Sequence, residues 1–312
     1  MTLLLFILIL GAVIFVHELG HFLFAKLCGI YVYEFAIGMG PKILSKKGKK
    51  GETVYSLRLI PIGGFCSLAG EGADEDHKIP KNRLLQSKTV WQRFLTMFFG
   101  AGFNFIFAIL LLFLVGLIWG APNYKPIVSD VTANSPAEIA GIVSGDTVIE
   151  VNDHNISTID DLSLYLTLAK KDKPTEMVVR KENGEEVTYQ ITPKEKEVDG
   201  ETQYQYGISL DSSRERGLLS TIKFTFVKTG SLFKQMFLTL GNLFTGGLKV
   251  SQLSGPVGIY SIVGEQSKGG LANILYLIAF LSINVGFINL LPLPAFDGGR
   301  ILFLFIEKIK GS

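Results

Sequence analysis

The sequence predicts an α-helical polytopic membrane protein with three transmembrane helices, a small membrane-associated β-region and an inserted α+β domain. Apolar residues make up 48% of the 312 positions and the mean hydropathy is +0.36, which is too apolar for an ordinary soluble protein. Long apolar runs occupy residues 1–27, 94–120 and 271–296, and each is long enough to cross a bilayer. Residues 121–211 instead combine alternating apolar patterns, turn residues and an acidic excess, as in a small soluble domain.

Composition excludes two further classes of protein. Cys28 and Cys66 are the only cysteines, so the sequence does not predict a disulfide framework. The lysines do not form a basic face interleaved with base-stacking aromatic residues, and we expect no nucleic-acid partner.

The first apolar run contains the motif His17-Glu18-Leu19-Gly20-His21. Histidines four positions apart share one helical face, where two imidazole nitrogens can hold a single metal ion. Glu18 can then take a proton from a water molecule beside that metal, as in the HExxH zinc hydrolases. Ionisable groups inside a membrane-length helix are costly and favour a functional role. The alternative is a helix whose histidines lie near the lipid headgroups and bind nothing.

The run Thr2–Leu27 is predicted to be a membrane span and not a signal peptide, because no basic segment precedes it and no cleavage site follows it. Residues 28–93 carry an excess of basic side chains close to both neighbouring spans. The positive-inside rule therefore places this segment in the cytoplasm, the amino terminus outside, and the HELGH motif near the cytoplasmic face.

Within residues 28–93 the pattern predicts strands at Tyr31–Ile37 and Thr53–Ile60, joined by a polar turn. Glycine-proline segments at 38–41 and 61–64 are expected to end these strands. Irregular backbone this close to a bilayer must be shielded by protein or line a wet cavity. Two interpretations stay open: a sheet that dips toward the metal with a free edge for a substrate strand, or a plain cytoplasmic hairpin.

The second predicted span, residues 94–120, contains Gly100, Gly102 and Asn104 near its start. Small residues allow helices to approach closely, and an amide can hydrogen bond across a helix interface. We therefore expect all three residues to serve helix packing.

The soluble domain is predicted from residues 121 to 211. Ser135 and Pro136 are typical of a helix start and Gly141 of a helix end. We expect helices at 136–140 and 160–169, and strands at 127–131, 147–151, 176–180 and 186–191.

The stretch SPAEIAGIVSGDTVIEVND, residues 135–153, resembles the PDZ family pattern SPA-x-x-AGL-x-x-GD-x-I-x-x-ING. This resemblance implies a groove that takes an extended peptide or a chain end by β-addition. The alternative is a domain that acts only as a steric filter or spacer. The next segment, 212–270, is predicted to hold an amphipathic helix at 220–244 along the outer membrane surface, followed by a linker broken at 246–247 and 254–256.

The last segment, 271–312, combines the third span with an unusual end. Pro292, Pro294 and the pair Gly298-Gly299 must unwind the chain while it is at membrane depth. Asp297 then arrives near the cytoplasmic face, at the depth of the two histidines. It is the only acidic residue besides Glu18 in the predicted membrane-depth segments.

A catalytic zinc site needs three protein ligands and one open position. His77 and His154 lie in polar segments, and His154 falls on the opposite side of the membrane. The sequence therefore predicts His17, His21 and Asp297 as ligands of Zn²⁺, with Glu18 as general base. An Asp297 that only ends a helix is the alternative.

Together, HELGH in the first span, the PDZ-like insertion and NLLPLPAFDGG in a later span resemble the site-2 protease family, in its bacterial regulator of sigma-E protease group. The stretches SLRLIPIGGF, LSGPVGI and FIEKIKG extend the likeness over nearly the whole chain. The resemblance implies the same zinc ligands and base. It also implies that Asn284 and Asn289 hold the unwound substrate and that residues 31–68 are the membrane-associated β-region.

The function implied is that of an intramembrane zinc metalloprotease of the bacterial cell membrane. Its partners would be the lipid bilayer, pre-trimmed single-span membrane proteins such as anti-sigma factors or signal-peptide remnants, and a possible peptide ligand of the PDZ-like domain outside the cell. The rival hypotheses are a non-catalytic scaffold that binds peptides through that domain, and a transporter. A transporter is disfavoured because no inverted repeat of broken helices is visible.

The chain departs from the family pattern in two places. Phe99–Asn104 reads FGAGFN where the family often has AGP-x-x-N, which changes helix shape but not chemistry. The family also has a fourth span after the aspartate motif. Since this chain ends at Ser312, we expect that last transmembrane helix to be absent from it.

Overall fold

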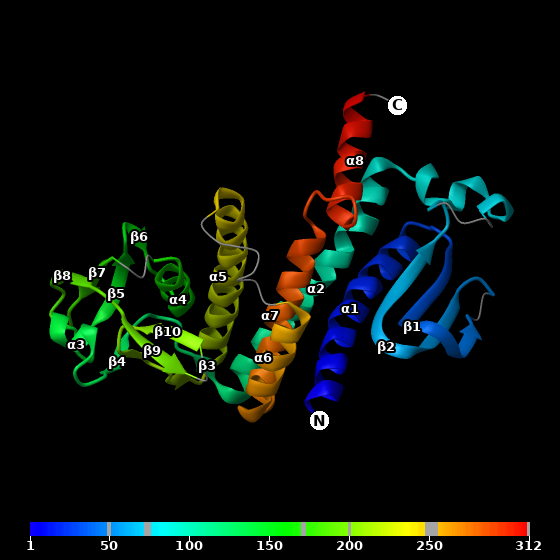
Figure 1. Cartoon of the computed structure of the whole chain (residues 1–312). Helices are drawn as coiled ribbons and strands as arrows, with labels where there is room; N and C mark the ends of the chain where they lie inside the picture. Colours follow the sequence, from blue (N-terminus) through cyan, green and yellow to red (C-terminus); the bar gives the residue numbers. More distant parts are fainter. Residues whose placement is uncertain (49–50, 72–75, 170–172, 199–200, 247–254, 311–312) are drawn as a thin grey trace. The chain divides into compact units, whose positions relative to one another are not determined.

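The computed structural model describes residues 1–48, 51–71, 76–169, 173–198, 201–246 and 255–310. The chain divides into two compact units, one formed by residues 1–112 with 254–312 and one by residues 113–253 (Figure 1). The first unit contains the helices and the sheet around the predicted metal site. The second contains most of the short strands.

Among the described residues, three helices are long and apolar enough to cross a membrane: α1 (Thr2–Leu27), α2 (Val90–Trp119) and α7 (Leu271–Asn289). The three predicted spans are thus present. Helix α2 begins four residues before the predicted Phe94, because the hydroxyl of Thr89 accepts a hydrogen bond of 3.2 Å from the Gln92 N–H. A capping threonine satisfies a donor that the first helical turn would otherwise leave unpaired.

A short helix, α6 (Pro256–Lys268), packs in the first unit against α1 and α7. The buried side chains of this cluster are Ile9, Val13, Val263, Leu277 and Leu281. The sequence pattern assigned residues 256–268 to a linker, and that prediction is wrong. Pro256 begins the helix at a position where its missing N–H costs nothing. The predicted breaks at 247 and 254 lie outside the described residues.

The β-region consists of two long strands, β1 (Val32–Lys47) and β2 (Val54–Leu68). The prediction that glycine-proline segments end the strands is wrong, because both strands continue through them. Gly38, Gly40 and Gly63 adopt φ values of 84°, 81° and 86°, and the register shifts along the ladder. Left-handed glycines of this kind bend a strand as a bulge does and leave its pairing intact on either side.

The bends divide each of the two strands into segments that pair side by side, and the outermost segments form the two edges of the sheet. Residues 34–37 pair with 64–67 on one side and with 54–57 on the other, and 44–47 pair with 54–57 from beyond. Within the described ranges, segment 64–68 therefore has a neighbouring strand on one side only. Several large apolar side chains around the bends are exposed, namely Ile37, Met39, Ile43, Leu44, Leu59 and Ile60. Such a surface suits contact with lipid better than contact with water.

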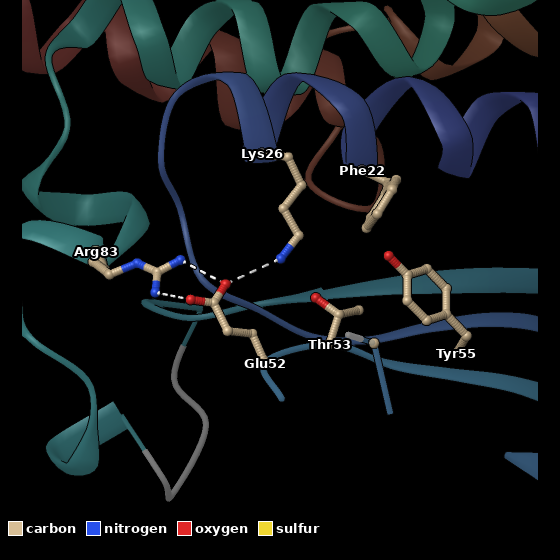
Figure 2. A pocket seen from close by; sticks show the side chains of 7 residues that line it. Phe22, Lys26, Glu52, Thr53, Tyr55 and Arg83 are labelled. Atoms are coloured by element: carbon tan, nitrogen blue, oxygen red, sulfur yellow. Dashed lines mark hydrogen bonds and ion pairs between the residues drawn. The ribbon is translucent and has the colours of Figure 1, made fainter. Parts of the chain in front are cut away.

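Glu52 ties the sheet to the end of α1 and to a short 3₁₀ turn, Lys81–Arg83 (Figure 2). Its carboxylate accepts hydrogen bonds of 2.6 and 3.0 Å from the Arg83 guanidinium and lies 3.5 Å from Lys26 Nζ. The Arg83 hydrogen bonds lower the pKa of Glu52 to about 2. These groups line a cavity of about 450 Å³ that Phe22 and Tyr55 complete.

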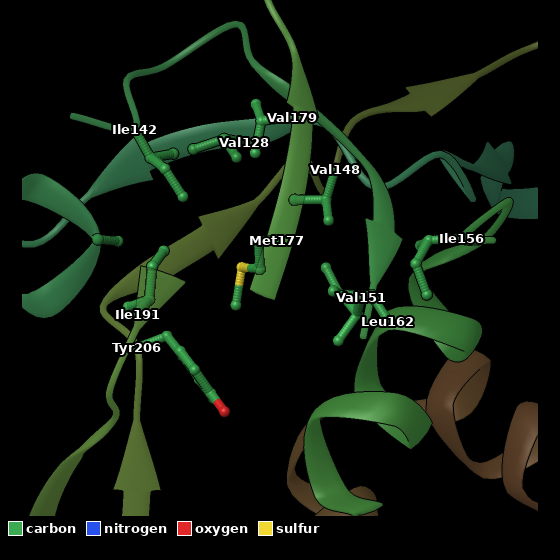
Figure 3. Close-up of a cluster of buried hydrophobic side chains, with 11 residues drawn as sticks. Val128, Ile142, Val148, Val151, Ile156, Leu162, Met177, Val179, Ile191 and Tyr206 are labelled. Atoms are coloured by element: carbon green, nitrogen blue, oxygen red, sulfur yellow. The ribbon is translucent and has the colours of Figure 1, made fainter. Parts of the chain in front are cut away.

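The second unit is built around a four-stranded antiparallel sheet in the order β6-β5-β7-β8. Met177, Val148 and Val151 lie at the centre of its core (Figure 3). The strands are β5 (Thr147–Val151), β6 (His154–Asn155), β7 (Thr175–Arg180) and β8 (Glu186–Ile191), with β4 (Val128–Val131) paired to β11 (Ile208–Leu210) beside them. The four strands predicted in this region are present.

Helix α3 (Pro136–Ala140) starts as predicted. The Ser135 hydroxyl accepts a hydrogen bond from the Glu138 N–H, and Gly141 ends the helix at φ 96°. Helix α4 (Ile159–Leu168) carries a capping box formed by Thr158 and Asp161. The pattern did not predict β6 or β11. It also did not predict the short strands β3 (Ala121–Pro122), β9 (Lys194–Val198), β10 (Glu201–Gln205) and β12 (Arg214–Glu215).

Helix α5 (Leu218–Thr245) spans the predicted amphipathic helix and packs on α4 within the second unit. Lys228 pairs with Asp160 at 2.5 Å, and Lys234 pairs with Asp161 at 2.6 Å. Burial lowers the pKa of Lys228. Two of the lysines that interrupt the apolar pattern of α5, Lys228 and Lys234, therefore have carboxylate partners on the neighbouring helix, whereas Lys223 Nζ lies 6.0 Å from the centre of the Tyr124 ring.

Replacing Glu52 by Gln is expected to lower the free energy of unfolding by ~0.5–1 kcal/mol, the range for a partly exposed ion-pair network. Since the folded-state pKa of Glu52 is depressed, its stabilisation is complete above about pH 4.5 and is lost as the pH falls toward about 2. Unfolding of the wild type and the variant, followed from pH 7 to pH 3, should therefore show a difference that shrinks with acid. As a control, Glu186→Gln removes the well-exposed ion pair with Arg180 and should have little effect at any pH.

Candidate metal centre

Helix α1 places His17 and His21 one turn apart on the same face. Their side chains are buried, with 7% and 8% of their surface exposed. Their Nε2 atoms lie 3.1 Å apart. The spacing predicted from the sequence therefore brings two ring nitrogens to a common point.

Asp297, which lies near the other end of the chain, supplies a third side chain at this point. The predicted unwinding is present, but α7 ends at Asn289, earlier than the predicted Phe296, and α8 (Asp297–Lys310) begins after a turn. A Cβ atom on Gly298 would lie 2.2 Å from the carbonyl oxygen of Leu290, and one on Gly299 would lie 2.2 Å from that of Leu293. The glycine pair is needed because the turn folds back against the first residues of α8.

The Asp297 carboxylate meets both imidazoles. Its Oδ2 lies 3.1 Å from His17 Nε2 and 3.2 Å from His21 Nε2. For a tetrahedral zinc with bonds of about 2.0–2.1 Å, neighbouring ligand atoms lie roughly 3.3 Å apart. In addition, Asp297 Oδ2 is buried and has no hydrogen-bond partner among the residues that the structure describes. The three atoms are therefore spaced as three ligands of one zinc ion would be.

A backbone carbonyl orients His21. The His21 Nδ1 lies 2.8 Å from the carbonyl oxygen of Thr96, so a proton on Nδ1 is donated to that oxygen and the Nε2 lone pair faces Asp297. The matching Nδ1 of His17 is buried without a hydrogen-bond partner in the described part of the chain. The sequence did not identify Thr96, because Thr96 acts here through its backbone carbonyl, a group that every residue has.

Helices α1 and α2 cross closely beside the histidines. A Cβ on Gly20 would lie 1.9 Å from the Phe99 carbonyl oxygen, and a Cβ on Gly100 would lie 2.3 Å from His21 Nε2. The predicted packing role of Gly100 is confirmed. Asn104 is fully buried, but among the described residues its amide has no hydrogen-bond partner, and its backbone carbonyl accepts a bond of 3.0 Å from Ser282.

Glu18 faces the edge segment of the sheet. The backbone of Cys66 hydrogen bonds to its carboxylate, and a Cβ on Gly64 would lie 3.7 Å from Glu18 Cγ. Since Gly64 and Cys66 belong to the segment with one free edge, the carboxylate and that edge lie together. A peptide bond held beside this edge would be close to a proton acceptor.

The other residues singled out from the sequence have different surroundings. Asn284 and Asn289 each donate a 3.0 Å hydrogen bond to a carbonyl four residues earlier in α7, Phe280 and Val285. None of the described contacts joins these amides to the metal-binding atoms. His77 and His154 are exposed, as predicted, and the His154 ring stacks on Tyr165.

Comparison with known proteins identifies a family and several relatives. Residues 5–312 match the family model described as Peptidase family M50. The chain is 33% identical to zinc metalloprotease RasP of Bacillus licheniformis and 33% identical to the regulator of sigma-W protease RasP of Bacillus subtilis, with 100% of this chain and 91% of each relative covered. It is 32% identical to zinc metalloprotease RasP of Geobacillus kaustophilus, with 98% of this chain and 89% of the relative covered.

Replacing Gly100 by Ala is expected to weaken zinc binding by about 10–100-fold, because the new methyl group displaces the His21 ring from the ligand position. Zinc affinity measured by chelator competition on the detergent-solubilised protein tests this expectation. Gly230→Ala on α5 is the matched control: no heavy atom lies within 4 Å of the added carbon, so zinc affinity should not change. Wild-type affinity in Gly100→Ala would contradict the close approach of α2 to His21.

Proposed function

Since this chain belongs to peptidase family M50 and is a zinc metalloprotease of the site-2 type, we propose that it hydrolyses peptide bonds within or near transmembrane segments of single-span membrane proteins. The observation that carries the proposal is the convergence of three ligand atoms within 3.2 Å of one another, two from the membrane-length helix α1 and one from the turn that follows the membrane-length helix α7. A site at this place meets its substrate inside the bilayer or at its surface.

His17, His21 and Asp297 would hold the zinc ion. When bound, zinc supplies Lewis-acid polarisation of the scissile carbonyl and makes water more acidic. The Thr96 carbonyl keeps the His21 ring in the tautomer that a metal ligand requires. The burial of both histidines, together with the low exposure of Asp297, limits the access of competing water to this polar cluster.

Glu18 would act as the general base. Its carboxylate takes the proton of the attacking water and returns it to the leaving amide nitrogen. The hydrogen bond from the Cys66 backbone holds this carboxylate at the sheet edge, where the peptide bond would lie. By family likeness, Asn284 and Asn289 would bind the unwound backbone of the substrate.

The free edge at residues 64–68 would receive that backbone. A peptide bond in a helix is shielded and hydrogen bonded, so it must unwind before hydrolysis, and a sheet edge can pair with the groups released. The exposed apolar side chains around the bends of β1 and β2 support a sheet in contact with lipid over a plain cytoplasmic hairpin.

The strand-rich second unit would be a PDZ-like domain on the extracytoplasmic side. Its capped helix α3 and its four-stranded sheet suit the sequence likeness at residues 135–153. The active site would then lie near the cytoplasmic face of a bacterial cell membrane, and the domain would exclude proteins with bulky outer parts. One relative is named a regulator of sigma-W protease. By family likeness, pre-trimmed anti-sigma factors or signal-peptide remnants would be the substrates of this chain.

Glu18→Gln is expected to reduce cleavage of a model transmembrane peptide by about 10²–10⁴-fold, the usual contribution of a general base, while zinc is retained. Asp297→Asn should lose both zinc and cleavage, because a neutral amide replaces the anionic ligand. Zinc per chain and product formation, measured on the same purified protein, check both outcomes. The exposed His154→Ala is the control and should behave as the wild type. Undiminished cleavage by Glu18→Gln would refute the proposal.

A substrate with its outer part removed is expected to be cut at least about tenfold faster than the same protein with a folded outer domain, because binding of the bulky form is blocked. The comparison uses the full chain in proteoliposomes with both substrates at equal concentration. Equal rates would contradict the role of the second unit as a filter.

A further inference from the structure

Helix α8, whose first residue is Asp297, is anchored by ion pairs at two points. Near its end, Glu307 Oε1 lies 2.8 Å from Arg93 Nη1 on α2. One turn after Asp297, Arg300 pairs with Glu71, which follows β2. Arg300 Nη1 also lies 4.0 Å from the sulfur of the buried Met97. Both ion pairs join residues that are far apart in the sequence, so they hold α8 to the rest of its unit.

Apolar packing alone holds α8 weakly. Ile301 and Leu304 are buried, but Leu302, Phe303 and Phe305 are 42%, 62% and 52% exposed. A cavity of about 410 Å³ lies between α8 and its neighbours, and Arg93, Glu71 and Arg300 are among the residues that line it. A helix with a cavity along its packed side can tilt or rotate at little cost unless polar contacts fix it.

The two partners of α8 belong to the elements that position the rest of the metal centre. Arg93 lies one turn before Thr96, whose carbonyl orients His21. Glu71 lies three residues beyond the end of β2, and β2 places the Cys66 backbone against Glu18. The ion pairs therefore connect α8, which begins with the ligand Asp297, to the helix that orients His21 and to the strand that contacts Glu18.

We propose that Arg93–Glu307 and Arg300–Glu71 are positioning pairs, which set the tilt and rotation of α8 so that Asp297 reaches the imidazole pair. This inference rests on the assignment of Asp297 as a zinc ligand under the proposed function. Glu307 lies ten residues beyond Asp297, or about 15 Å along the helix. A tilt of about 4° around that far end moves Asp297 by roughly 1 Å, whereas a ligand bond tolerates only a few tenths of an ångström.

The test is a charge swap across α2 and α8 in the full-length chain. Arg93→Glu and Glu307→Arg each place like charges together and should raise the zinc dissociation constant about tenfold, as loss of a supporting contact does at other metal centres. The double variant R93E/E307R restores opposite charges and should return the constant to within about threefold of the wild type. Arg93→Gln is the milder variant if a like-charge pair prevents folding.

Melting of the zinc-free protein separates positioning from general stability. Because Arg93 and Glu307 are partly exposed, the zinc-free melting temperature should change little in all these variants. The matched control, R180E/E186R with its single variants, alters an ion pair in the other unit and should leave zinc affinity within about twofold. Wild-type affinity in both single variants, or a double variant as weak as the singles, would overturn the proposal.

The outcomes also separate this inference from the proposed function. Tight zinc binding with the expected charge-swap pattern, but no cleavage of any transmembrane peptide, would remove the protease proposal and leave the positioning pairs. Cleavage by the wild type without any effect of the swaps would remove only the positioning pairs. Absence of zinc binding by the wild type would overturn both.

Discussion

The meeting of two imidazoles from the apolar helix α1 with a carboxylate from the start of α8 is the constraint to which the first unit is adapted. His17 and His21 come from one helix, and Asp297 comes from a turn near the other end of the chain. Ionisable groups at this depth are stable only when they compensate one another or share a cation. Their convergence therefore demands backbone approaches that ordinary side chains would prevent. Glycines provide them where α1 crosses α2 and where the turn before α8 folds back.

The surrounding contacts extend this arrangement outward in layers. A carbonyl of α2 orients His21, and the backbone of β2 holds Glu18. Beyond these, the ion pairs of α8 connect α2 and the end of β2 to the helix that begins with Asp297. Glu52, which precedes β2, forms ion pairs with Lys26 at the end of α1 and with Arg83 in the Lys81–Arg83 turn. Each of these contacts is polar, and each joins residues from different elements of the first unit.

The second unit follows the rules of soluble proteins. Its core lies around Met177 and Val148, and its helices carry ordinary caps at Ser135 and Thr158. Helix α5 shows how a membrane-like composition can still belong to such a unit. Lys228 and Lys234 pair with carboxylates on α4 within residues 113–253, whereas Leu219, Phe226 and Phe237 of α5 remain exposed.

The sequence by itself determined the three apolar helices, the strands and helices of the second unit that carry strong local signals, and the residue types of the candidate metal site. These features are local: hydrophobic period, caps and the HELGH spacing act within a few residues. The sequence did not predict that the two long strands continue through Gly38 and Gly63, and it did not predict helix α6 or the short strands β9 to β12. Glycine and proline residues give the same local pattern whether a strand ends or only bends. Only the tertiary structure decided which carbonyl orients His21, how near Gly100 lies, and which ion pairs hold α8. Those contacts join residues distant in sequence, and they depend on three-dimensional distances that no local pattern encodes.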